Sequence, residues 1–118
     1  MTGRLTTHVL DTMAGRPAAG VPVSLFRLKD GERQAVTTAR TNADGRCEAP
    51  LLEKGAMTAG TYELCFHVAD YFRSRNVELS DPPFLDVVPV RFGIGDESAH
   101  YHVPLLISPY GYSTYRGS

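Results

Sequence analysis

The stretch HYHVPLLISPYGYST, residues 100–114, carries the strongest fold signal because it predicts two strands joined by a tight turn. In an extended strand, side chains at i and i+2 point to the same side, about 7 Å apart. His100 and His102 therefore share one face of the first strand. The opposite face is apolar and is expected to enter a core, with Tyr101, Val103, Leu105 and Ile107. The sequence thus predicts an ordered hairpin that displays two imidazoles.

Short alternating segments separated by Gly, Pro, Asn and Asp fill the rest of the chain. Such segments are typical of short strands, which we expect at 5–11, 21–28, 34–41, 46–49, 61–68 and 84–92. One short helix is expected over 69–74. With the terminal hairpin, about eight strands result, and this number in a small chain predicts an all-β fold, a β-sandwich. Residues 1–118 are expected to form one domain.

Charge and composition exclude several classes of partner. Twelve basic and thirteen acidic residues leave a formal charge of −1, so no basic stripe for nucleic acid or an anionic membrane is expected. The sequence has no apolar run long enough for a membrane span, and its first residues lack the apolar stretch of a signal peptide. We therefore expect a cytoplasmic protein, in which Cys47 and Cys65 are reduced, structural thiols.

Two further polar side chains, His8 and Arg46, are candidates for a site. His8 is expected to face away from the core, since Leu5, Thr7 and Val9 alternate with it. Arg46 follows a predicted turn, and its planar guanidinium suits a flat anionic or carbonyl-rich ligand. A pair such as His100 and His102 is too small for a zinc site, which needs a third and usually a fourth ligand. Each of these residues also fits an ordinary solvent-facing role.

Four motifs occur together: LTTHVLD at 5–11, DGR at 44–46, HYHVPLL at 100–106 and YRGS at 115–118. In combination they resemble the 5-hydroxyisourate hydrolases, the transthyretin-related enzymes of urate breakdown. The resemblance spans nearly the whole chain and includes SPYGYS at 108–113, which transthyretin nearly shares. It implies a transthyretin-like (prealbumin-like) β-sandwich and a homotetramer whose catalytic clefts lie at subunit interfaces.

The resemblance also implies roles for individual residues. His8 and His102 share the work of accepting a proton from water, with the choice of base left open, and Arg46 holds the oxygen-rich substrate and its developing charge. The terminal residues complete the pocket: Ser118 among the catalytic groups, and Tyr115, Arg116 and Gly117 in substrate binding. Arg116 alternatively anchors the tail. His100 is expected beside the site, either supporting the other imidazoles or joining His8 and His102 as a third imidazole that traps adventitious zinc. No metal or cofactor is expected for the reaction.

The implied function is hydrolysis of 5-hydroxyisourate to 2-oxo-4-hydroxy-4-carboxy-5-ureidoimidazoline. A rival interpretation is a small-molecule carrier that has the same sandwich but performs no chemistry, as transthyretin does. Two imidazoles and a guanidinium favour the enzyme, because a carrier of an apolar ligand gains little from them. Pro104 and Leu106 share the histidine face, and we expect a second subunit to cover this apolar pair.

Overall fold

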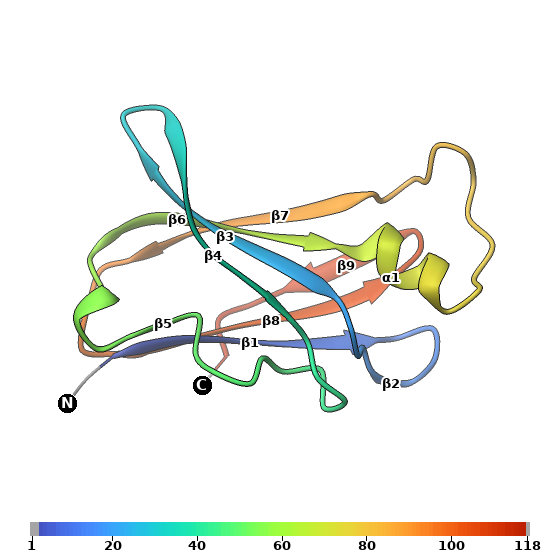
Figure 1. Cartoon of the computed structure of the whole chain (residues 1–118), viewed down its shortest axis with the longest axis horizontal. Helices are drawn as coiled ribbons and strands as arrows, with labels where there is room; N and C mark the ends of the chain where they lie inside the picture. The colour runs from blue at the N-terminus through green and yellow to red at the C-terminus, as the bar shows by residue number, and fades with distance from the viewer. Residues whose placement is uncertain (1–2, 118) are drawn as a thin grey trace.

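Two sheets stack to form the fold in the computed structural model, which describes residues 3–117 (Figure 1). The first sheet has the order β2-β1-β8-β9, with β5 also paired to β1. Its strands are β1 (Arg4–Asp11), β2 (Arg16–Pro17), β5 (Leu52–Glu53), β8 (His100–Ser108) and β9 (Gly111–Thr114). The second sheet has the order β4-β3-β6-β7. Its strands are β3 (Pro22–Lys29), β4 (Glu32–Arg40), β6 (Gly60–His67) and β7 (Val87–Ile94).

Two short helices complete the described part of the chain. A 3₁₀ turn spans Lys54–Ala56, and α1 spans Val68–Ser74, where Val68, Ala69, Tyr71 and Phe72 are buried. Figure 1 shows α1 at one end of the sandwich, following β6. The helix expected at 69–74 is thus confirmed. Neither helix is long and apolar enough to cross a membrane.

The core lies between the sheets, and the inward-facing side chains of β1 and β8 supply one side of it. Leu5, Thr7 and Val9 of β1 are buried, whereas Thr6 and His8 are half-buried on the other face. In β8, the predicted inward residues Tyr101, Val103, Leu105 and Ile107 are all buried. The apolar side chains of β3 and β6 pack against them from the second sheet. Both predicted faces are confirmed.

The predicted strand at 46–49 is wrong. Arg46 makes a single antiparallel bridge to His8, and no ladder follows. The reason lies in how the edge of β1 is occupied. β5 pairs with Arg4 and Leu5 and β2 pairs with Leu10 and Asp11, so only the middle of β1 remains for another segment. These two strands of two residues each were not predicted, and they bring the number within residues 3–117 to nine.

Two other expectations differ in detail. The strand expected from residue 84 begins at Val87, since the preceding residues form a loop. Pro104, expected to lie uncovered beside Leu106, is already buried within the single chain because β8 is flanked by β1 and β9, whereas Leu106 remains half-buried. Cys47 and Cys65 are unpaired thiols, as expected.

Candidate active site

Parallel pairing of β1 with β8 places the outward side chains of the two strands next to each other. The register aligns Arg4 with His100, Thr6 with His102, and His8 with Pro104. Figure 1 shows the two strands running side by side along the lower part of the view. Since alternate residues share a face, two segments almost a full chain length apart contribute to one polar surface.

Arg46 reaches this surface because a tight turn delivers it to the edge of β1. The Oδ1 atom of Asn42 accepts hydrogen bonds from the backbone N–H groups of Asp44 and Arg46, at 2.9 and 3.2 Å. Gly45 has φ +76°, and its carbonyl accepts a 2.8 Å hydrogen bond from the Val9 N–H. A Cβ atom at position 45 would lie 2.4 Å from the Val9 carbonyl oxygen, so only glycine fits this approach.

The C-terminal tail lies along the other edge of β8. The N–H of Gly117 donates a 2.8 Å hydrogen bond to the carbonyl of His102, and the two residues form an antiparallel bridge. A Cβ atom at position 117 would come within 2.5 Å of Cδ2 of the His102 ring. His102 therefore lies between β1 and the tail. Ser118 is outside the described residues.

A cavity of about 380 Å³ opens between these elements. It is lined by Arg4, Thr6, Thr7, Arg46, Cys47, Ala49, His100 and His102. The lining contains two guanidinium groups and no carboxylate, so the cavity favours an anionic or carbonyl-rich ligand. The structure thus brings Arg46, His100 and His102 around one space, with His8 paired to Arg46 beside it.

Both imidazoles of the cavity are biased toward the neutral form. Burial, followed by the positive charges of Arg46, His100 and His8, lowers the pKa of His102 below its ordinary value. Burial and then Arg4 lower the pKa of His100. A neutral imidazole at neutral pH can accept a proton, so His102 is suited to act as a general base.

Thr6 is a site residue that the sequence pattern did not single out. Its Oγ1 atom lies 2.7 Å from Nε2 of His100 and 2.8 Å from Nδ1 of His102. The alternation that placed His8 outward also placed Thr6 outward, but the parallel register that joins it to the histidines was not visible in the sequence. Arg4 and Cys47 also line the cavity, although the sequence pattern marked neither as a site residue.

The side chains of Tyr115 and Arg116 lie elsewhere. Both line a different cavity of about 390 Å³, which is bordered by β7 and by the buried face of β8. The Arg116 guanidinium lies 4.2 Å above the ring of Tyr101, a cation–π contact that holds the tail against the sandwich. Within one chain, the structure therefore does not bring these two side chains to the histidines.

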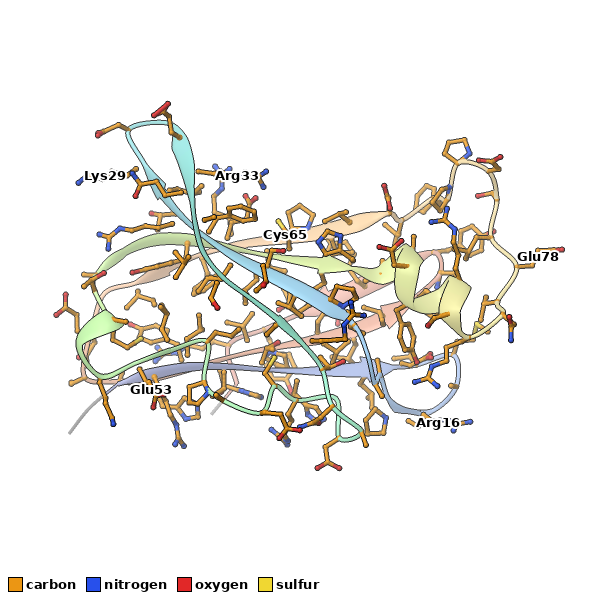
Figure 2. The ribbon with its side chains drawn as sticks, in the orientation of Figure 1. Arg16, Lys29, Arg33, Glu53, Cys65 and Glu78 are labelled. Carbon is orange, nitrogen blue, oxygen red and sulfur yellow. The ribbon has the colours of Figure 1, made fainter. Side chains whose placement is uncertain are left out.

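His67 lies at the end of β6 in the second sheet and does not line the histidine cavity. It lines a cavity of about 440 Å³ with Ser24, Phe26, Arg33, Glu63, Cys65, Val87 and Pro89 of the second sheet. Figure 2 shows the side chains of Arg33 and Cys65 on that sheet, remote from β1. Among residues 3–117, no three His, Cys, Asp or Glu side chains are grouped so as to hold a metal ion.

Comparison with known proteins agrees with this geometry. Residues 5–117 match the model of the HIUase/Transthyretin family. The 5-hydroxyisourate hydrolase 2 of Rhizobium meliloti (strain 1021) is 61% identical over 117 residues, covering 99% of this chain and 98% of that protein. The structure of Klebsiella pneumoniae 5-hydroxyisourate hydrolase superposes with a TM-score of 0.81 at 38% identity, covering all of both chains. Sea bream transthyretin in complex with thyroxine gives a TM-score of 0.86 at 28% identity, covering 97% of this chain and 94% of the other. The chain belongs to the HIUase/Transthyretin family.

Proposed function

We propose that this protein is an enzyme that hydrolyses 5-hydroxyisourate in urate catabolism. The single observation that carries the proposal is the meeting of Arg46 and His102 in one carboxylate-free cavity. Relatives that carry this enzyme's name are 61% and 62% identical to the chain over nearly its full length. The product is 2-oxo-4-hydroxy-4-carboxy-5-ureidoimidazoline.

The proposed reaction opens the lactam ring with one water molecule. The water oxygen forms a bond to the lactam carbonyl carbon while a water proton passes to an imidazole nitrogen of His102 or His8. The C–N bond then breaks, and the leaving nitrogen takes that proton back. The lowered pKa of His102 supports it as the first acceptor, because its ring is neutral before the reaction.

Arg46 is proposed to bind the carbonyl oxygens of the substrate and the oxyanion that develops as water attacks. Its planar guanidinium offers paired N–H donors, and the Asn42–Gly45 turn fixes its backbone before substrate arrives. A charge placed in advance against a developing oxyanion is often the largest single contribution to rate.

The tail is proposed to close the pocket, with Ser118 acting on the substrate and Tyr115, Arg116 and Gly117 supporting binding. The bridge between Gly117 and His102 supports this role, since it holds Gly117 against the backbone of His102. Arg116 contributes by anchoring the tail through its stacking on Tyr101.

We further propose a homotetramer with sites at subunit interfaces, located in the cytoplasm. β7 and β9 are edge strands of the two sheets, and both border the cavity that holds Tyr115 and Arg116. Edge strands are ready to pair with a second copy. The half-buried Leu106, on the histidine face, gives a second surface that a partner would cover.

The direct test is an assay with freshly made substrate. Urate oxidase generates 5-hydroxyisourate from urate, and its ultraviolet decay is followed with and without the protein. We expect decay well above the spontaneous rate. Binding of the compound without faster decay would contradict hydrolysis and favour the carrier alternative. That alternative is based on the structural similarity to sea bream transthyretin in complex with thyroxine.

A further inference from the structure

One hydroxyl group joins the two histidines of the cavity. Thr6 Oγ1 lies within hydrogen-bond distance of both His100 Nε2 and His102 Nδ1, at 2.7 and 2.8 Å. The ring centroids of the two histidines are 6.1 Å apart, so the hydroxyl fills the gap between them. Because threonine is branched at Cβ, its hydroxyl has little rotational freedom on a strand.

The Thr6 hydroxyl carries only one proton, and this limits the possible hydrogen-bond arrangements among Thr6, His100 and His102. When both imidazoles are neutral, Thr6 donates to one ring and accepts from the other. In the first arrangement His102 donates through Nδ1–H and His100 accepts at Nε2. In the second, His100 donates and His102 accepts, which leaves the proton of His102 on Nε2.

Only the first arrangement is compatible with His102 as the base. It leaves the lone pair of Nε2 available to a water molecule, whereas the second places a proton there. The first also persists after His102 gains a proton, because Nδ1–H still donates to Thr6. In the second arrangement, that hydrogen bond is lost as soon as the ring is charged.

We propose that Thr6 is a positioning residue for the reaction: its hydroxyl accepts a hydrogen bond from Nδ1–H of His102 and donates one to Nε2 of His100, so that Nε2 of His102 is held as the proton acceptor. This inference rests on the proposed function. It also gives His100 a defined task, which is to accept the Thr6 proton. The strand register keeps Thr6 in place, since the adjacent Thr7 hydroxyl donates a 2.7 Å hydrogen bond to the Val103 carbonyl.

Nitrogen-15 NMR of the imidazoles in the unmodified protein tests the proposal without any activity. We expect neutral His102 to carry its proton on Nδ1 and to have an unprotonated Nε2. In T6V, a near-isosteric variant without the hydroxyl, this preference should weaken. Finding neutral His102 of the parent protonated on Nε2 would overturn the proposal, whatever the protein's activity.

Kinetics supply the second test. T6V should lose about 100-fold in kcat with KM little changed, because a misdirected base affects the chemical step. T6S keeps the hydroxyl and should recover most of that rate. The matched control is T12V, which removes a threonine hydroxyl from the end of β1, where it donates 2.9 Å to the Ile107 carbonyl, outside the cavity. Its kcat should equal that of the parent.

The acid limb of the kcat profile distinguishes positioning from packing. Among residues 3–117, the charged or titratable groups around His102 are Arg4, His8, Arg46, Cys47 and His100, and T6V leaves all of them in place. Loss of the hydrogen bond that stabilises charged His102 should move the limb of T6V to lower pH. A folded T6V whose kcat and acid limb equal those of the parent would overturn this proposal. Hydrolysis by the parent in the same assay would show that the proposed function itself still holds. Equal losses in T6S and T6V would also overturn it, since the hydroxyl retained in T6S would then do nothing to preserve the rate.

Discussion

At the residue scale, the site depends on imidazoles that stay neutral in a positively charged cavity. His102 is flanked by Arg46, His8 and His100, and each of these disfavours a second positive charge nearby. Such surroundings raise the population of the base while weakening its affinity for the proton it must accept. Arg46 thus lowers the pKa of its neighbour His102, in addition to the proposed role of binding developing negative charge.

Replacing either His8 or His102 by Asn should lower kcat by about two to four decades, the usual contribution of general acid–base catalysis. Folding should survive, because both side chains are only half-buried. The measurement is kcat with Tm for each variant. H67N is the matched control, since His67 lies on the second sheet, and it should keep parental activity. A double variant of His8 and His102 with the full rate would remove both from the mechanism.

The pH dependence of the rate should report the environment of His102. In the proposed mechanism the neutral ring is the active form, so activity should be lost as pH falls through the pKa of His102. Burial and Arg46 lower that pKa, so the acid limb of kcat/KM should lie below about 6.5, the ordinary value for histidine. R46Q removes a positive charge, so the limb should shift to higher pH in addition to a fall in rate. If the acid limb of R46Q lies at the same pH as that of the parent, the charge of Arg46 does not affect the pKa of His102.

At the element scale, two glycines allow chain segments to approach the central strands from both sides. Gly45 brings the Arg46 turn to β1, and Gly117 brings the tail to β8. In both cases a side chain would collide with the strand, at 2.4 Å from Val9 O and 2.5 Å from His102 Cδ2. The site is therefore assembled by close backbone contact as well as by reactive side chains.

Gly117→Ala should lower kcat/KM by about tenfold or more, because the added methyl must displace either the tail or the His102 ring. Tm should change little, since the residue is near the chain end. Gly111→Ala in β9 is the matched control: its Cβ would meet only Ser108 Oγ, at an ordinary 3.7 Å. Parental kcat/KM in the Gly117 variant would show that the tail does not contact the reacting groups.

At the scale of the whole molecule, the sandwich has free edges at β7 and β9 and a partly uncovered histidine face. If partners cover that face, Leu106 lies in an interface. Leu106→Lys should then convert the proposed tetramer of 12.9 kDa chains to a smaller species and lower the activity with it. Sedimentation velocity together with kcat checks this. The control Val36→Lys, at an exposed position of β4, should change neither the mass of the assembly nor kcat. An unaltered mass and rate for L106K would contradict an interface there.

The sequence by itself determined the local features of this protein. Alternation along β1 and β8 is a property of the extended backbone, so the inward faces of both strands were predictable. The burial of Pro104 on the outward face was not, because it depends on the neighbouring strands β1 and β9. The helix and the turn before Arg46 followed from equally local signals. The motifs around His8, Arg46 and His102 also marked the residues that the fold later gathers around one cavity or its margin.

Only the tertiary structure decided which distant segments meet. The parallel pairing of β1 with β8 joins residues 96 positions apart, and it depends on how the two apolar faces pack together in the core. For that reason the contact of Thr6 with His100 and His102 had no sequence signal. The position of Arg46 also depends on tertiary structure, because its single bridge needs the space that β2 and β5 leave along β1. Arg116 is a third case, since its stacking on Tyr101 directs it away from the histidines. Periodicity specifies which face a side chain occupies, and packing of the core specifies what that face meets.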